Sequence, residues 1–212
     1  PGSKTANKAW TDTLKQDFST LAPPLLPAIF DPMTFLSADG NSVNMCHVHV
    51  DDIAISGSKK FKAQLKEMMI TNYTPDNPEA LKWGPLALYL AVQYDRLECG
   101  GYKAHMGAYL RTCVKNSGVD LSTGTKPSPL PAGTAFYANE VPSNGKLHPQ
   151  QPWFIKNIGA IRYAVEAGPR KEMKYALALL SPFMQNPGEV HIAALRHLLQ
   201  YIAGSCDLGA IY

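Results

Sequence analysis

Two adjacent carboxylates, Asp51 and Asp52, are the residues of this sequence whose type and spacing point most directly to chemistry. Neighbouring carboxylates repel each other, and a divalent cation or solvent can offset that repulsion. Residues 43–56 predict a strand, a tight turn at the aspartates and a second strand. The sequence therefore predicts a metal site at the tip of a hairpin. The alternative is a solvated turn, since Asp is a frequent turn residue.

Strand alternation gives the same hairpin a second interpretation, because it places His47, His49 and Asp51 on one face of the sheet. This spacing comes within one residue of the His-x-His-x-Asp-His signature of metallo-β-lactamase-type hydrolases, which bind two zinc ions. The final histidine of that signature is absent, and a strand is predicted where that fold needs a loop and a helix. A zinc hydrolase using these three residues is thus one alternative. Sheet histidines that bind no metal are another.

Hydrophobic periodicity along the chain predicts a mixture of helices and strands. Helices are predicted at residues 7–20, 59–69, 106–116, 153–165, 171–184 and 190–203, and strands at residues 33–36, on both sides of Asp51, and at residues 88–97 and 102–104. Residues 117–150 are rich in proline and glycine, which predicts a linker or an extended crossing segment. We expect an α+β fold, in which an antiparallel sheet with packed helices is followed by a largely α-helical part.

Composition limits the classes of protein that fit. Hydrophobic residues make up 45% and charged residues 17% of the 212 residues, as in a folded globular protein. No apolar run reaches the roughly 20 residues of a membrane helix, and prolines interrupt residues 21–30, so we expect a soluble intracellular protein without a secretion signal. The dispersed cysteines predict buried free thiols. A formal charge of +3 permits a nucleic-acid partner without arguing for one.

The residues around the aspartates resemble a known family. Residues 46–57, Cys-His-Val-His-Val-Asp-Asp-Ile-Ala-Ile-Ser-Gly, resemble the Tyr-Val-Asp-Asp hairpin of Ty1/copia retrotransposon reverse transcriptases, with His49 in place of the usual aromatic residue. Residues 6–10 are similar to the family's Gly-Leu-Lys-Gln-Ala-x-x-x-Trp segment, in which Gly and Gln lie near the incoming nucleotide and template, and Thr5 stands near that Gln.

The resemblance continues to the last residue. Residues 80–92 are similar to Glu-Leu-Lys-Tyr-Phe-Leu-Gly-Ile, and residues 100–119 to the hairpin and helix that follow, with Met106 in place of the usual Gln. Residues 158–163 resemble Leu-Val-Gly-Ser-Leu-Leu-Tyr, and residues 175–212 follow the Tyr-Ala-Val, Leu-Ser-Arg-Phe-Met and Arg-x-Leu-x-Tyr-Leu-x-Gly-Thr pattern. The resemblance thus covers nearly the whole chain.

The family organisation implies three parts. Residues 1–104 would be a partial palm with the Asp-Asp hairpin, residues 105–150 a thumb helix and an extended linker, and residues 151–212 a helical connection region. The connection would lead towards a ribonuclease H domain, whose first strand residues 208–212 would begin. Fingers would precede residue 1, and an integrase would belong to the same polyprotein.

The resemblance also implies a function, RNA-directed DNA polymerisation by two-metal nucleotidyl transfer in the complete parent enzyme. Asp51 and Asp52 would be catalytic and would bind two Mg²⁺ ions together with a third carboxylate from before residue 1. A primer–template of RNA and DNA and a deoxynucleoside triphosphate would be the partners, in a cytoplasmic particle or the nucleus. Lys103, Arg111 and Lys115 would contact phosphates, with solvated helix charge as the alternative.

A further alternative is a decayed or domesticated remnant. Departures from the family at Thr5, His49 and Met106, together with the missing fingers, fit a protein that binds nucleic acid or protein without catalysis. In either case we expect these 212 residues to be inactive as a polymerase by themselves.

Overall fold

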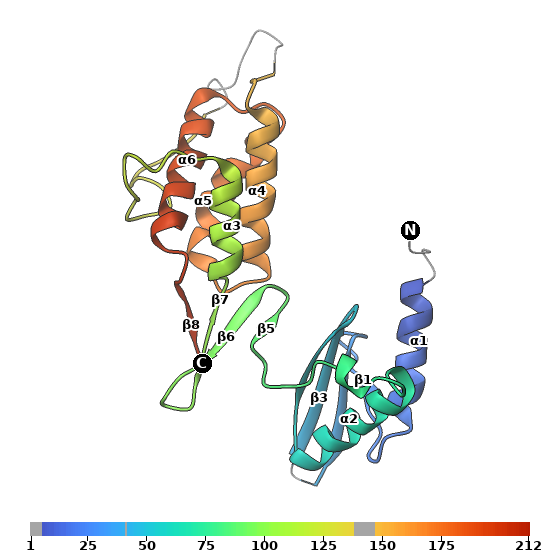
Figure 1. The fold of residues 1–212 in the computed structure, drawn as a ribbon. Coiled ribbons are helices and arrows are strands. Elements are labelled where there is room, and N and C mark those ends of the chain that lie inside the picture. The colour runs from blue at the N-terminus through green and yellow to red at the C-terminus, as the bar shows by residue number, and fades with distance from the viewer. Residues whose placement is uncertain (1–5, 41, 138–146) are drawn as a thin grey trace. The chain divides into compact units, whose positions relative to one another are not determined.

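The computed structural model describes residues 6–40, 42–137 and 147–212. The chain forms two compact units, Pro1–Leu86 and Ala87–Tyr212, and each contains its own antiparallel sheet with helices (Figure 1). The predicted α+β fold class is confirmed. None of the described helices combines the length and the apolar character needed to cross a bilayer.

The first unit has four strands in the order β1-β2-β3-β4, with every neighbouring pair antiparallel. Its elements are α1 (Ala6–Ser19), β1 (Leu26–Pro27), β2 (Thr34–Asp39), β3 (Ser42–His49), β4 (Asp52–Ser56), α2 (Lys59–Tyr73) and the short 3₁₀ helix η1 (Pro78–Ala80). Helix α2 begins at Ser58, whose hydroxyl accepts the Phe61 N–H, and it runs one turn beyond the predicted end.

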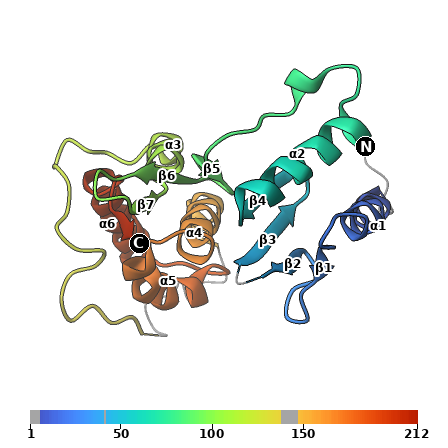
Figure 2. The same ribbon diagram turned by 90° about the horizontal axis from the view of Figure 1, so that it is seen from below.

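Both helices of this unit pack on one face of its sheet (Figure 2). Along β3, Asn44, Cys46 and Val48 are buried and the residues between them are more exposed, as a period of two predicts. The buried face contacts apolar side chains of both helices: Leu14, Phe18, Phe61, Leu65 and Met69. Burial raises the pKa of the Cys46 thiol to about 12, so this cysteine stays protonated.

The second unit consists of a sheet in the order β5-β6-β7-β8 and a group of packed helices (Figure 1). Its elements are β5 (Leu88–Tyr89), β6 (Val92–Arg96), β7 (Tyr102–His105), α3 (Gly107–Ser117), α4 (Gln151–Glu166), η3 (Lys171–Met173), α5 (Lys174–Leu180), η4 (Ser181–Phe183), α6 (Glu189–Gly204) and β8 (Gly209–Ile211). Helices α3 and α5 each pack against both α4 and α6. The apolar face of α6, the helix predicted at residues 190–203, is fully buried: Ile192, Leu195, Leu198, Leu199 and Ile202.

The prediction of one strand at residues 88–97 is wrong, because Leu90 and Ala91 form a tight turn between β5 and β6. Both residues have positive φ, 51° and 63°, and neither is a glycine. The Tyr163 hydroxyl of α4 donates a hydrogen bond to the Leu90 carbonyl oxygen at 2.9 Å. The turn therefore depends on a helix distant in sequence, and the local sequence lacks the Asn-Gly type of signal that marks such turns.

Residues 208–212, which the resemblance assigns to a ribonuclease H strand, lie in the sheet of this unit. Strand β8 pairs with β7, and Tyr102 and Tyr212 exchange two backbone hydrogen bonds of 3.0 and 2.9 Å. The hairpin at residues 88–105 likewise belongs to the same compact unit as the helices. The inferred palm, thumb and connection segments therefore do not coincide with the two compact units.

Residues 118–137 contain no regular helix or strand, yet they pack along the helices. The His197 ring nitrogen Nε2 lies 3.1 Å from the Ser128 carbonyl oxygen, and the Gln200 amide donates to the Asp120 carbonyl oxygen at 2.9 Å. Leu130 is buried. Of the two alternatives, a linker or a crossing segment, the structure shows a crossing segment for these residues.

The four cysteines are all free thiols, as predicted. Cys46, Cys113 and Cys206 are buried, but Cys99 is exposed, so the prediction of burial is wrong at that position. Cys99 lies in the loop between β6 and β7, where the chain turns at the surface.

Arg170 is the largest fully buried side chain of the described residues, and its guanidinium joins η3 to the end of α6. Its Nε donates to Glu172 at 2.6 Å, and its two terminal nitrogens donate to the carbonyl oxygen and the hydroxyl of Ser205, both at 2.9 Å. The planar fork thus satisfies three acceptors at once.

Arg170→Lys should lower the free energy of unfolding by about 2 kcal/mol, because an ammonium group cannot reach all three acceptors. Urea denaturation, monitored by circular dichroism, measures this change. Arg162→Lys, on exposed α4 surface, is the matched control and should change stability by less than about 0.5 kcal/mol. Equal losses in both variants would contradict the role given to Arg170.

Candidate functional site

The predicted hairpin at the two aspartates is confirmed. Strands β3 and β4 pair antiparallel with His49 opposite Asp52, and Val50 and Asp51 form the turn. Both aspartates are exposed, Asp51 in the turn and Asp52 as the first residue of β4. The hairpin thus presents two adjacent carboxylates to solvent at one end of the sheet.

The turn is held in a conformation that its sequence does not favour. Val50 has a φ of 57°, in the left-handed region that a β-branched residue rarely adopts. Such a conformation costs on the order of 1–3 kcal/mol and persists only where surrounding contacts enforce it. The enforcing contact is a hydrogen bond of 2.7 Å from the Trp10 indole Nε1 to the Val50 carbonyl oxygen.

Trp10 lies on α1, and a contact with α2 holds its ring in place. Its ring meets the Tyr73 ring of α2 edge-on, with the centroids 5.1 Å apart and an interplanar angle of 70°. The Tyr73 hydroxyl donates a hydrogen bond to the Asp17 carboxylate of α1, and partial burial followed by this bond raises the Tyr73 pKa well above its usual value. Residues from α1 and α2 therefore brace the tip that carries the aspartates.

The histidines of β3 lie on the face of the sheet that the two helices leave uncovered. The His47 Nδ1 lies 2.9 Å from the Thr34 hydroxyl and 3.3 Å from an Asp31 carboxylate oxygen. Hydrogen bonds from the Thr34 hydroxyl and the Met33 N–H, with the nearby His47 charge, hold the pKa of Asp31 below its usual range. His49 is exposed opposite Asp52.

This arrangement gives no support to the zinc-hydrolase alternative. The Nδ1 of His47 already faces Thr34 and Asp31, and Asp51 lies in the turn beyond the strand. Among residues 6–40, 42–137 and 147–212, no three His, Cys, Asp or Glu side chains are close enough together to hold a metal ion.

The same observation limits what the two aspartates can do alone. Carboxylate oxygens are the hard ligands that Mg²⁺ prefers, and exposure at a tip leaves room for the waters that this ion retains. Asp51 and Asp52 therefore fit a Mg²⁺ site as a partial set of ligands. Completing the set requires a donor that the described residues do not place beside them.

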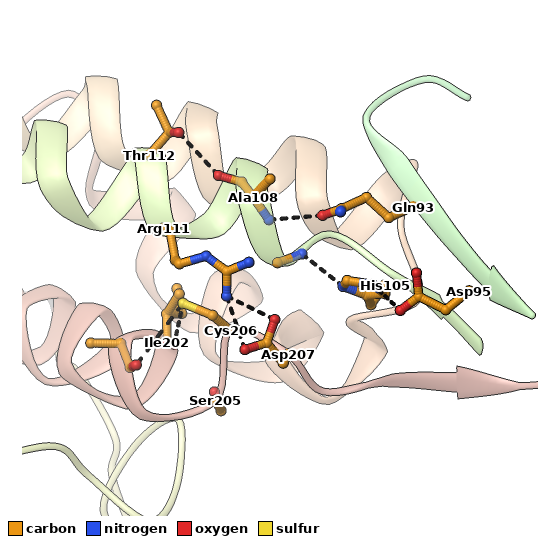
Figure 3. Close-up of polar contacts among 12 residues, drawn as sticks. Gln93, Asp95, His105, Ala108, Arg111, Thr112, Ile202, Ser205, Cys206 and Asp207 are labelled. Carbon is orange, nitrogen blue, oxygen red and sulfur yellow. Dashed lines mark hydrogen bonds and ion pairs between the residues drawn. The ribbon is translucent and has the colours of Figure 1, made fainter. Parts of the chain in front are cut away.

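The predicted nucleic-acid-binding residues belong to the second unit, where Arg111 is already engaged. Figure 3 shows its guanidinium directed at Asp207, with one nitrogen donating to both carboxylate oxygens at 2.8 and 2.9 Å. This contact lowers the pKa of Asp207. The positive charge of Lys103 on β7 lowers the same pKa by a smaller amount. Lys115 is exposed in the last turn of α3.

A polar cluster that the sequence reasoning missed lies beside Arg111 and caps the start of α3 (Figure 3). Gln93 accepts the Ala108 N–H at 2.9 Å, and the His105 Nδ1 accepts the Gly107 N–H at 3.2 Å. The other ring nitrogen of His105 lies 2.9 Å from Asp95. Strands β6 and β7 thus supply the cap that the residue before the helix, Met106, cannot provide.

The sequence did not single out two other residues that position the site. Trp10 lies within the helix predicted at residues 7–20, and Tyr73 lies beyond the end of the helix predicted at residues 59–69. An indole or phenol beside an apolar helix face signals a possible hydrogen-bond donor, but not its partner. Thr5, which the resemblance places near the incoming nucleotide, lies outside the described residues.

The fold and the hairpin define a mixed α and β unit that exposes a carboxylate pair, and comparison with known proteins gives it a context. The chain is 25% identical over 210 residues to a protein of Arabidopsis thaliana, the Retrovirus-related Pol polyprotein from transposon RE1, and 26% identical over 209 residues to the corresponding polyprotein from transposon RE2. Each alignment covers 98% of this chain and 13% of the relative, so the chain spans about one eighth of these polyproteins.

No family model matches the chain, and no solved structure matches it. The two similarities support a segment of a retrotransposon Pol polyprotein.

Trp10→Phe should lower the free energy of unfolding by about 1 kcal/mol, because it leaves the Val50 carbonyl oxygen without its donor while keeping an aromatic ring. Hydrogen–deuterium exchange at residues 50–53 should become faster in this variant. Trp83→Phe, in a residue that packs against the same core, is the control and should leave exchange at the tip unchanged. Unchanged exchange in both variants would contradict the bracing role of Trp10.

Val50→Gly should leave stability unchanged or raise it by up to about 1 kcal/mol, since glycine adopts positive φ without strain. Val43→Gly is the comparison, because Val43 is also exposed but lies within β3. That variant should lose about 1 kcal/mol. Chemical denaturation of both variants measures the difference, and a Val50→Gly loss as large as that of Val43→Gly would show that the turn is unstrained.

Proposed function

We propose that this chain is the part of a retrotransposon reverse transcriptase that carries two of the carboxylates for RNA-directed DNA polymerisation. The observation that carries the proposal is the exposed pair Asp51 and Asp52 at a strained hairpin tip, which Trp10 holds in place. The similarity to two Pol polyproteins over 98% of the chain supports it. The resemblance of residues 46–57 to the Tyr-Val-Asp-Asp hairpin supports it too.

In this proposal Asp51 and Asp52 would hold Mg²⁺, which would supply activation of the primer hydroxyl and stabilisation of the charge on the departing pyrophosphate. The remaining work of this chain is positional. Because the tip is braced through Trp10 by α1 and α2, the two carboxylates keep a defined geometry, which electrostatic stabilisation of a transition state requires.

The proposal also assigns partners from outside these residues. A third carboxylate and the fingers that cover the incoming nucleotide come from another segment of the polyprotein. The polyprotein also contains ribonuclease H and integrase parts. The substrates are a primer–template and deoxynucleoside triphosphates. Lys103 and Lys115 are available for backbone phosphates, whereas Arg111 would have to exchange Asp207 for a phosphate.

The remnant alternative predicts the same fold and differs in chemistry. His49 lies opposite Asp52 at the position where the family has an aromatic ring, and the chain retains both aspartates. A remnant would keep the braced hairpin and lack polymerisation in every context.

The isolated chain should show no primer extension on an RNA template, and a hybrid with a copia-type fingers segment joined before residue 1 should show Mg²⁺-dependent extension. In that hybrid, Asp51→Asn or Asp52→Asn should lower the extension rate 100-fold or more, since each removes a metal-binding carboxylate. Gel analysis of extended primers measures the rate.

Asp39→Asn is the matched control, because Asp39 ends β2 next to the other hairpin turn of the same sheet. This variant should retain the full rate. A folded hybrid without activity favours the remnant. Equal losses at Asp39 and at Asp51 would contradict the site assignment.

A further inference from the structure

Helix α2 concentrates positive charge on one surface of the first unit. Four of the eight lysines of residues 1–86 lie in its first eight residues: Lys59, Lys60, Lys62 and Lys66. All four are exposed. Lys59, Lys62 and Lys66 are spaced by three and four residues and therefore share one face of the helix, which we call the lysine stripe.

This arrangement works against the stability of the helix. Like charges three and four residues apart repel each other, and the N-terminal end of a helix already carries partial positive charge. The first turn of α2 contains no acidic residue. Within the described part of the chain, the ion pairs do not include any lysine of the stripe. An anionic partner would remove this penalty.

The lysine stripe begins at the end of the sheet opposite the aspartates and extends along α2, whose last residue Tyr73 meets Trp10 near the tip. Strand β4 runs away from the tip, and the Ser58 N–H before α2 donates to Asn44 near the start of β3 at 3.0 Å. At about 3.3 Å per residue, Asn44 is roughly 20 Å from the turn at Val50. The first lysines of the stripe are therefore well separated from the candidate metal site.

We infer that the lysine stripe is a second nucleic-acid contact, which binds the sugar–phosphate backbone of an RNA–DNA duplex without reading its sequence. The stripe spans about 10 Å along the helix axis, at 1.5 Å per residue. Phosphates of one strand of a duplex follow each other at about 3.4 Å along its axis, so the stripe matches about three of them. The choice of a nucleic acid rests on the proposed function, and the stripe supplies the charge.

The test measures duplex binding by the full 212-residue chain. Fluorescence anisotropy of a labelled RNA–DNA hybrid gives the affinity over a range of salt concentrations. The triple variant Lys59→Glu, Lys62→Glu, Lys66→Glu should bind about tenfold or more weakly at low salt. Its slope of log affinity against log salt should shrink by about 2 to 3, because each lost phosphate contact removes about 0.9. The midpoint of urea unfolding should not fall, since acidic side chains near the start of α2 interact favourably with the partial positive charge of that helix end.

The matched control is Lys8→Glu, Lys15→Glu, Lys82→Glu, which changes the charge of the same unit equally but leaves the stripe intact. It should keep the salt slope. Equal weakening by the two triple variants, tighter binding of poly-glutamate than of the duplex, or no duplex binding would each overturn the inference.

Asp51→Asn, Asp52→Asn separates this inference from the proposed function. Duplex binding by that variant should persist, because the stripe does not depend on the carboxylates. If the hybrid polymerase is inactive but the stripe binds duplex, the proposed function fails alone. If the hybrid is active but the stripe variant binds normally, the further inference fails alone.

Discussion

The hydrogen bond from the Trp10 indole to the Val50 carbonyl oxygen determines the shape of the hairpin tip on which the candidate site depends. Val50 lies in a region of φ that valine avoids, so the turn needs a contact from elsewhere in the unit. That contact exists because Leu14 and Phe18 bury the apolar face of α1 against the sheet, which brings Trp10 to the tip. Apolar burial on one side of the sheet thus positions carboxylates at its end.

In the second unit a side chain from a helix also hydrogen-bonds to the backbone of a turn with positive φ. Leu90 and Ala91 form a tight turn with positive φ, and the Tyr163 hydroxyl donates to the Leu90 carbonyl oxygen, as the Trp10 indole does to Val50. Each donor also meets a tyrosine ring of a neighbouring helix edge-on, Tyr163 with Tyr109 and Trp10 with Tyr73. In both units an amphipathic aromatic side chain on a helix stabilises an unfavourable hairpin turn, because its ring packs and its polar atom reaches the backbone.

Charge within the first unit is unevenly distributed. The aspartates occupy one end of the sheet, and the lysines of α2 begin at the other end. For the proposed function this separation is favourable, because lysines close to the carboxylates would compete with a cation for them. In the second unit Arg111 and Asp207 neutralise each other. Their ion pair connects α3 to the segment after α6.

The sequence alone determined the elements whose signals are local. Apolar periodicity predicted most of the helices, and two aspartates between apolar runs predicted the hairpin, since these patterns depend on neighbouring residues. Tertiary structure decided what depends on distant partners. The split of residues 88–97 at Leu90, the pairing of β8 with β7 and the engagement of Arg111 by Asp207 all need contacts between residues far apart in the chain. No local pattern encodes such contacts, because they arise only when packing brings those residues together.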